Sequence, residues 1–343
     1  DQKMSKYEIK EVKNKKEWEE FVFGAEVESF LQSWNWGESN IRVGKRVFRL
    51  GMHEGNKLKG VALVIKESAK RGPHFLIPGG PILDWTDTEV VNLLFKYLKN
   101  LAKKEGVWFI RVRPELTDNE KNSKIFRRLG FISSPMHLHA ENTWVVGIDK
   151  SEDEILSDMR KTTRYLVRKS SKEGYDIEKT IDPAKTKILY DLQKETVERH
   201  KFVGFPEEIF RAQLETFGKD GQALLFVTRM GKLIMNAAII IFYGKYAYYH
   251  HSASSEKSRV TNASYFLQWE AIKEAKARGS LYYNMWGIAK TDDPKHRFAG
   301  VTLFKKGFGG ERIDWLHAHD LPISWKYNLT HAFESARKIS RRL

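Results

Sequence analysis

The sequence of 343 residues contains no cysteine. A chain without cysteine forms no disulfide and has neither a thiol nucleophile nor a cysteine-liganded zinc, which fits a reducing compartment. Long hydrophobic runs are also missing, because the most apolar segment, residues 233–243, is too short to span a bilayer and contains Asn236. We therefore expect a soluble, cytoplasmic protein, with peripheral contact at the cytoplasmic membrane as the most that such a chain makes.

Two ligand signatures are absent as well. The His, Asp and Glu residues show no metal-ligand spacing such as His-Glu-x-x-His. No segment has the Gln/Arg-x-x-Gly-x-Gly/Ala loop that opens a helix and cradles the pyrophosphate of acetyl-coenzyme A. The glycine pairs at 79–80 and 309–310 do not precede predicted helices. We expect no metal and no coenzyme A.

Basic residues are abundant: 59 Lys and Arg against 44 Asp and Glu give a formal charge of +15. Such an excess favours a polyanionic partner, namely nucleic acid, an anionic membrane or a phosphorylated substrate, although a merely soluble basic protein has the same composition. Hydrophobic residues make up 41% of the chain, enough to build the cores of two ordinary domains.

A repeated order of elements divides the chain into two halves. Each half is predicted to contain a hairpin, a long helix that ends at a glycine, and a further strand. These segments are residues 46–52, 57–65, 86–105 and 107–112 in the first half, and 224–228, 232–240, 265–278 and 281–285 in the second. Chance agreement of common elements is the alternative, but the shared order favours a duplication.

Antiparallel strands that lead into a helix and a further strand suit the N-acyltransferase fold. We therefore expect an α/β (α+β) protein of two tandem, duplicated N-acyltransferase-like (GNAT-like) domains, with mixed, mostly antiparallel sheets flanked by helices. The first domain is expected to span residues 1–149, with residues 323–343 returning to it, and the second to span residues 150–322.

A basic helix is predicted over residues 151–173. Ser151 and Glu154 form a capping box at its start, and Gly174 ends it. Cationic side chains recur on one face at four-residue spacing, with further lysines beside them: Arg160, Lys161, Arg164, Arg168 and Lys169. The stripe is either a solvated surface or a ridge that binds the phosphates of a nucleic acid, here tRNA.

Several segments, in order along most of the chain, resemble the Fem family of aminoacyl-tRNA-dependent transferases, which build peptidoglycan interpeptide bridges. The matching segments are Leu31-Gln32-Ser33-Trp34-Asn35-Trp36-Gly37, Pro78-Gly79-Gly80-Pro81-Ile82-Leu83-Asp84, the basic stretch 159–174, Tyr283-Asn284-Met285-Trp286-Gly287-Ile288 and Phe304-Lys305-Lys306-Gly307-Phe308-Gly309-Gly310.

The resemblance implies transfer of an amino acid from its tRNA ester to a stem-peptide amine of a peptidoglycan precursor. Aminoacyl-tRNA is then a co-substrate, and no other cofactor is expected. Some members carry a long helical arm in the second domain, but residues 183–201 leave no room for it, so the chain resembles the compact type. We expect a monomer.

The same resemblance assigns the candidate catalytic residues. Lys305 matches the family lysine that stabilises the oxyanion, and Phe304 matches the residue beside it. The alternative is that Phe304 and Phe308 anchor a turn while the lysines face water. Trp36 and Trp108 fall at positions that line the precursor cleft in the family.

Other family positions have changed. The usual Arg-x-Asp-Pro-Glu motif reads Arg111-Val112-Arg113-Pro114-Glu115, so Arg113 replaces a carboxylate once suspected as a general base. An expected lysine is Asn40, the Arg-Pro expected near Arg199 reads Phe205-Pro206, and the late Tyr-Asp reads Tyr283-Asn284. These losses favour a lipid-linked precursor over a UDP-linked one. Arg113, Arg199 and Asn284 remain candidate substrate-binding residues.

Tyr249, His250 and His251 are placed at the end of a strand of the second-domain hairpin, where they are candidates for substrate contact, and the histidines either for proton handling or for structural hydrogen bonds. The final segment, residues 325–343, has helical apolar spacing with basic residues outside it. We expect it to dock on the first domain, and interfacial binding to anionic lipid is the alternative.

Three functions remain open at this point: aminoacyl transfer to a peptidoglycan peptide, aminoacyl transfer to a lipid headgroup or another non-wall acceptor, and a silent protein that binds tRNA or precursor.

Overall fold

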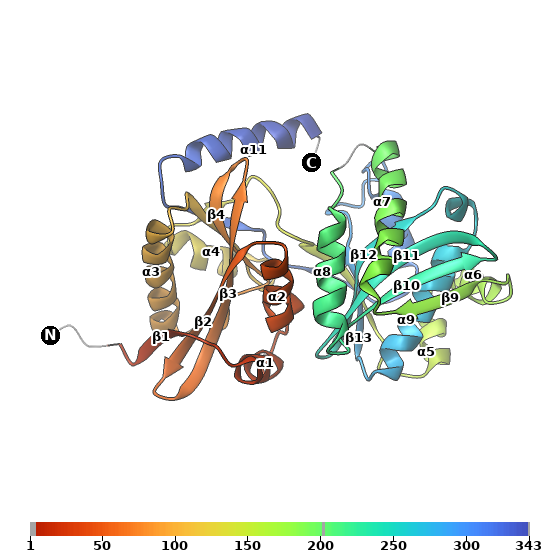
Figure 1. Cartoon of the computed structure of the whole chain (residues 1–343), viewed down its shortest axis with the longest axis horizontal. Coiled ribbons are helices and arrows are strands. Elements are labelled where there is room, and N and C mark those ends of the chain that lie inside the picture. The colour runs from red at the N-terminus through yellow and green to blue at the C-terminus, as the bar shows by residue number, and fades with distance from the viewer. Residues whose placement is uncertain (1–4, 201–202, 342–343) are drawn as a thin grey trace. The chain divides into compact units, whose positions relative to one another are not determined.

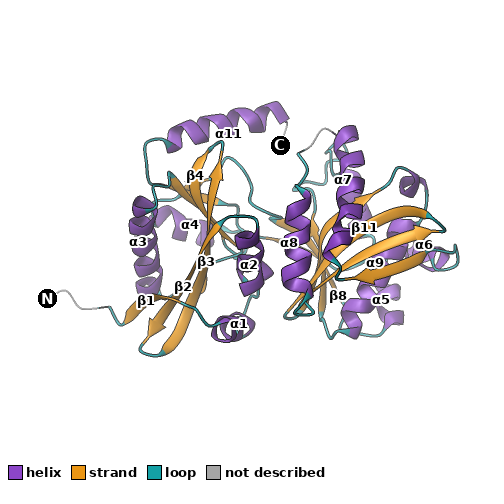
Figure 2. Cartoon of the chain, viewed as in Figure 1, coloured by secondary structure: helices purple, strands orange, loops and turns teal. Residues whose placement is uncertain are grey.

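The computed structural model describes residues 5–200 and 203–341, which divide into two compact units, residues 1–141 with 314–343 and residues 142–313 (Figure 1). Each unit contains one sheet flanked by helices, as Figure 2 shows. The predicted α/β class with mixed sheets is confirmed.

The first unit contains β1 (Tyr7–Glu11), α1 (Lys15–Phe23), α2 (Trp34–Arg42), β2 (Arg46–Glu54), β3 (Lys57–Ala69), β4 (Gly72–Pro78), β5 (Ile82–Leu83), α3 (Thr88–Lys104), β6 (Phe109–Arg113), α4 (Glu120–Arg128), β7 (Ile132–Ser133), β15 (His319–Pro322) and α11 (Tyr327–Arg341).

The second unit contains β8 (Asn142–Gly147), α5 (Glu152–Asp158), α6 (Lys161–Ser170), β9 (Asp176–Thr180), α7 (Thr186–His200), α8 (Glu207–Gly218), β10 (Ala223–Met230), β11 (Leu233–Tyr243), β12 (Tyr246–Ser254), α9 (Ala263–Ala277), β13 (Tyr282–Gly287), α10 (Ala299–Lys306) and β14 (Glu311–Asp314).

The two sheets have the same strand order. It is β1-β2-β3-β4-β6-β15-β7 in the first unit and, read in the same direction, β9-β10-β11-β12-β13-β8-β14 in the second. The fourth and fifth strands of each order run parallel, and every other neighbour pair with a resolved register is antiparallel. The central hairpin of each sheet also carries a β-bulge near its turn. The predicted duplication is therefore confirmed strand by strand.

The sixth strand of each sheet explains why the unit boundaries differ from the expected 149/150 and 322/323. β8 follows the first unit in the chain but pairs with β13 of the second sheet, which places the first boundary at 141/142. β15 comes from the other side of the second unit and pairs with β6 of the first sheet, so the second boundary lies at 313/314. Pairing partners far apart in sequence decide both positions.

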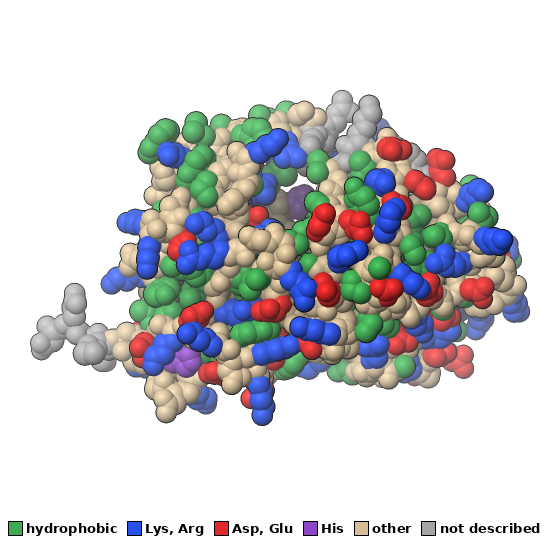
Figure 3. Space-filling view, viewed as in Figure 1, with side chains coloured by type: hydrophobic (Ala, Val, Ile, Leu, Met, Phe, Trp, Pro, Cys, Tyr) green, Lys and Arg blue, Asp and Glu red, His purple; other side chains and the backbone are tan. Residues whose placement is uncertain are grey.

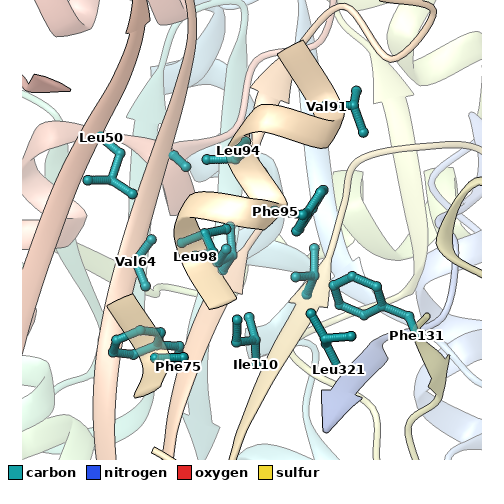
Figure 4. Packing of buried hydrophobic residues seen from close by; sticks show 14 of the residues in the cluster. Leu50, Val64, Phe75, Val91, Leu94, Phe95, Leu98, Ile110, Phe131 and Leu321 are labelled. Atoms are coloured by element: carbon teal, nitrogen blue, oxygen red, sulfur yellow. The ribbon is translucent and has the colours of Figure 1, made fainter. Parts of the chain in front are cut away.

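The core of the first unit lies between its sheet and α3. Asp87 caps this helix by accepting hydrogen bonds from two backbone N–H groups, and the apolar face beneath is buried. Figure 4 shows α3 side chains facing those of the strands. The buried residues common to this face include Val91, Leu94, Phe95, Leu98, Leu50, Val64, Phe75, Ile110, Phe131 and Leu321. On strand β6, Ile110 and Val112 face this core, so Arg111 and Arg113 face the opposite side of the sheet.

In the second unit, α5, α6 and α9 cover one face of the sheet through a shared core that includes Ile155, Val167 and Ile272. Helices α7 and α8 contact β10, β11 and β12.

The predicted single basic helix over 151–173 is wrong. The capping box of Ser151 and Glu154 is present, but the backbone leaves the helical region at Met159 and Arg160, which separates α5 from α6. Met159 is buried in the core, and the Arg160 N–H donates to the Gly307 carbonyl oxygen at 2.9 Å. Tertiary contacts therefore override the local helical preference.

The terminal helix α11 does lie on the first unit, but with the face opposite to the one expected. Its polar residues Tyr327, Thr330 and Glu334 are buried, whereas Leu329 and Phe333 are exposed. The buried partners are charged: Glu334 accepts hydrogen bonds from Arg111, and the Tyr327 hydroxyl donates to Asp320. Hydrogen bonding and ion pairing decide which face docks.

Candidate functional site

The parallel strands of the second unit separate midway along their length. β12 and β13 pair only from Tyr246–Tyr282 to Tyr248–Asn284, after which β12 continues beside β11 alone and β13 beside β8. The register with the outer neighbours shifts at the same level, at a bulge between Ile239 and Ile240 of β11 opposite His250, and between Asn284 and Gly287 of β13. Bulges of this kind re-aim side chains and are frequent beside active sites.

Lys305 lies at this separation. Its Nζ donates to the Gly287 carbonyl oxygen at 2.6 Å and lies 6.0 Å from the centre of the Tyr249 ring, so the amine has β13 on one side and β12 on the other. The side chain is 7% exposed, and burial lowers the pKa of the Lys305 amine to about 7. Lys305 is therefore a buried amine that changes charge near neutral pH.

Phe304 and the glycine-rich segment after it hold Lys305 in place. The Phe304 ring packs edge-on against Tyr265 and Phe308. The Gly309 carbonyl oxygen accepts a hydrogen bond from the Trp144 indole at 2.6 Å. Gly310 has a positive φ of 91°, and a Cβ there would lie 2.2 Å from the Val145 carbonyl oxygen, so only glycine fits. Phe304 supports the position of Lys305 through packing.

Tyr249 belongs to a small polar cluster behind the amine. The Tyr283 hydroxyl donates to Gln268 Oε1 at 2.6 Å, and Tyr249 interacts with the side chains of Gln268 and Ser252. Burial raises the pKa of both tyrosines, so both hydroxyls stay protonated at neutral pH. The cluster can donate hydrogen bonds but cannot accept a proton in this range.

Asn284 and His251 have structural surroundings. Asn284 Oδ1 accepts a hydrogen bond from the Trp286 N–H at 2.8 Å, which supports the positive φ of 67° at Trp286. The two histidines lie within β12, not at its end as expected, and His251 packs edge-on against Phe205 and Phe210. Burial lowers the pKa of His251 to about 3, so it is neutral at physiological pH.

In the first unit, Arg113 ends β6 as a fully buried cation. Its Nη2 lies 3.4 Å from Glu115 Oε1, while its Nε and Nη1 have no hydrogen-bond partner among the described residues. Burial raises the pKa of Glu115, which also accepts a hydrogen bond from Ser29. A guanidinium with two unused donors can hold an oxyanion.

Trp36 and Trp108, expected to line one cleft, lie at opposite ends of the first sheet. Trp36, on α2, packs edge-on against Phe30 and His139. Trp108 comes before β6, beside Gly72 at the start of β4, where a Cβ would lie 2.1 Å from the indole. The segment before α2 instead contacts the end of β4, where Gln32 donates to the Pro78 carbonyl oxygen.

The basic residues after the break are mostly on the surface: Arg160, Lys161, Arg168 and Lys169 are exposed, and Arg164 is half-buried. Arg164 donates to the Ser157 carbonyl oxygen, and Arg160 lies 3.4 Å from the Leu303 carbonyl oxygen. The stripe is thus anchored at one end to α10, which carries Lys305. Arg199 lies near the end of α7, and its side chain is outside the described residues.

Two further groups were not predicted. Gln268 is buried on α9 among apolar neighbours, and a polar residue on the apolar face of a predicted helix is the signal that could have revealed it. Glu115 was part of a recognised motif, but only the fold shows that it is the buried partner of Arg113. Within residues 5–200 and 203–341, no three His, Asp or Glu side chains group as a metal site requires. In the same ranges no helix has the length and hydrophobicity of a membrane span.

Two sheets of one topology, the second with separated parallel strands and a buried lysine beside them, define a tandem N-acyltransferase-like protein. The sequence profile of the FemAB family matches residues 14–147 and 227–335, more than half of the chain, and the chain belongs to this family. It is 22% identical to lipid II:glycine glycyltransferases of Staphylococcus aureus strains MRSA252 and USA300, over 81% of this chain and 84% of theirs.

Solved structures agree on the fold. The crystal structure of FemX matches with a TM-score of 0.82 at 20% identity, covering 95% of this chain and all of that one, 100%. A tandem GNAT protein from the clavulanic acid biosynthesis pathway matches with a TM-score of 0.59 at 10% identity, covering 93% and 99%. With relatives named as glycyltransferases, the protein is an aminoacyltransferase.

Proposed function

We propose that the protein transfers an amino acid from aminoacyl-tRNA to a stem-peptide amine of a lipid-linked peptidoglycan precursor. The observation that carries the proposal is the buried Lys305 amine where β12 and β13 separate. The names of the staphylococcal relatives, which act on lipid II, support a lipid-linked acceptor.

The reaction needs no covalent enzyme intermediate, because the tRNA ester is already activated. The acceptor amine attacks the ester carbonyl carbon, the carbonyl oxygen becomes an oxyanion, and the C–O bond to the ribose then breaks. The amine loses one proton and the ribose oxygen gains one, so the step balances. An oxyanion in a buried site is stabilised strongly by a fixed cation.

Lys305 suits the oxyanion role in its ammonium form. An ammonium has three donors, and the Gly287 carbonyl oxygen accepts from one of them. An anionic group in the site would favour the charged form and raise the pKa of Lys305 from about 7. Tyr249, at the same separation, would position the substrate.

The remaining candidates bind substrate away from the reacting bond. Arg113, with two unused donors, would hold a carboxylate or phosphate of the acceptor. The exposed cations of α6, Arg168 and Lys169 among them, would contact tRNA phosphates.

The test is to incubate the purified protein with a mixture of charged tRNAs and a detergent-solubilised lipid-linked muropeptide, and to measure the products by mass spectrometry. We expect one or more amino-acid residues added to the stem peptide, and no mass change of the protein with charged tRNA alone. Product with the UDP-linked precursor only would make the choice of acceptor wrong. Transfer to a different amine would replace the acceptor class, and tRNA binding without any product would exclude the enzymatic proposal.

A further inference from the structure

The terminal helix displays its apolar residues to solvent. Trp325 in the turn before α11 is 71% exposed, and along the helix Leu329 is 56%, Phe333 53% and Ile339 79% exposed. Leu329 and Phe333 follow Trp325 at four-residue intervals, so these side chains share one helix face. In Figure 3 hydrophobic side chains gather in the upper left of the view, over α11.

The opposite face of α11 is fixed by buried charge. Glu334 accepts hydrogen bonds from Arg111 at 2.6 and 3.2 Å and forms an ion pair with Arg71 at 3.1 Å. Arg111 also makes two hydrogen bonds to Asp320, to which the Tyr327 hydroxyl donates at 2.8 Å.

This network prevents the helix from turning its apolar face inward. Rotation about the helix axis would leave Arg111 and Asp320 buried without their partners, which is strongly unfavourable. The outward position of the apolar residues is therefore a stable feature of the first unit.

Cations flank the apolar face. Lys326 and Lys338 are exposed on α11 or at its start. Lys326 lies 5.6 Å from the Trp108 ring and, with Lys103, lines a shallow hollow beside the start of the helix. An apolar face bordered by lysines is typical of helices that lie in the interface of an anionic bilayer.

We propose that the exposed face of α11, formed by Trp325, Leu329, Phe333 and Ile339, docks into the surface of a bilayer rich in anionic phospholipid. The inference depends on the geometry of this helix and not on the proposed reaction. It would bring the first unit to the surface where a lipid-linked acceptor lies.

A second copy of the chain is a poorer occupant of this face. In a two-fold dimer the same patch meets itself, which would bring the flanking lysines of both copies together without a countercharge. Anionic headgroups neutralise these lysines while the acyl chains receive the apolar side chains. The formal net charge of +15 favours the same partner.

The test is flotation of the full chain with vesicles of phosphatidylglycerol and phosphatidylethanolamine, compared with phosphatidylcholine vesicles. We expect binding to the anionic vesicles that salt weakens. A Leu329→Ser/Phe333→Ser double variant should bind at least about tenfold more weakly, since each loses a large buried apolar group. The control is Val260→Ser, which removes an equally apolar side chain, 90% exposed, from the second unit and should bind as wild type.

A second readout reports on the depth of Trp325. Brominated acyl chains should quench part of the tryptophan emission in anionic vesicles, and Trp325→Phe should lose that part.

Equal binding of the wild type and the double variant would overturn the proposal, and so would equal binding to neutral and anionic vesicles. Sedimentation showing a dimer that the double variant lacks, without vesicle binding, would assign the face to a second copy instead. The double variant should retain aminoacyl transfer to a detergent-solubilised acceptor, so failure of the transfer reaction and failure of membrane docking are measured separately.

Discussion

The two units share one strand order but treat their parallel strand pair differently. In the first unit β4 and β6 stay paired over five positions, from His74–Phe109 to Pro78–Arg113. In the second, β12 and β13 pair over three positions and then separate. A duplicated fold has thus kept one sheet closed along this pair and opened the other, and the opened one carries the lysine.

Each unit also buries a cation near the end of the fifth strand, but of a different kind. Lys305 donates to a backbone oxygen and can lose its proton, because burial lowers its pKa to about 7. Arg113 keeps its charge and has two donors without partners. The difference indicates chemistry at Lys305 and anion binding at Arg113.

The largest effect is expected from Lys305→Met. The change keeps an apolar chain of similar length, so the fold should persist, while the loss of the cation should reduce kcat about 10²- to 10³-fold. Initial rates with charged tRNA and solubilised acceptor measure it. The matched control is Lys306→Met, since Lys306 pairs with Asp292 at the surface. Equal rates for Lys305→Met and wild type would remove the functional distinction between the two units.

Two arginines on β6 separate a structural cation from a binding cation in the first unit. Arg111→Met leaves Asp320 and Glu334 buried without their partner and should lower the free energy of unfolding by about 3 kcal/mol or more. Arg113→Met should lower it by less than about 1 kcal/mol, because few of its bonds are lost, and should raise the KM for the acceptor about tenfold. Denaturant unfolding and acceptor titrations test both, and a large loss of stability in Arg113→Met would make Arg113 structural instead.

The pH dependence tests the ionisation of Lys305. If the ammonium form stabilises the oxyanion, kcat should fall as pH rises above about 7, roughly fivefold from pH 7 to pH 8. Blank reactions correct for spontaneous hydrolysis of the tRNA ester. A kcat that rises over this range would show that the neutral amine is the active form.

Stability should follow the same ionisation with the opposite sign. The folded-state pKa lies below the model-peptide value of 10.5, so between pH 7 and that value the unfolded chain binds more protons. The contribution of Lys305 to the free energy of unfolding therefore rises with pH in this window, and Lys305→Met should flatten the rise.

The sequence predicts best the elements that local patterns define. The hairpins, α3 and α9, with the glycines that follow them, needed only hydrophobic period and turn residues, and their repeated order disclosed the duplication. Lys305 came from a family motif, because a lysine after a phenylalanine has no local sign of burial.

Features that depend on distant partners could not be predicted. The exchange of β8 and β15 between sheets, the break at Met159, and the outward apolar face of α11 each result from contacts across large sequence separations. Trp108 likewise lies away from Trp36, because the two residues are placed by opposite ends of β4.

The smallest effect is expected at the basic surface of the second unit. Arg168 is exposed on α6, and Arg168→Gln should weaken tRNA binding about threefold and lower the slope of log affinity against log salt by about one, since each phosphate contact releases about one counterion. The matched control is Lys124→Gln, an exposed cation on α4 of the first unit, which should change neither quantity. Filter binding of charged tRNA across salt concentrations measures both. Equal effects of the two variants would mean that tRNA responds to net charge alone, whereas a loss confined to Arg168 would place tRNA on the unit that carries Lys305.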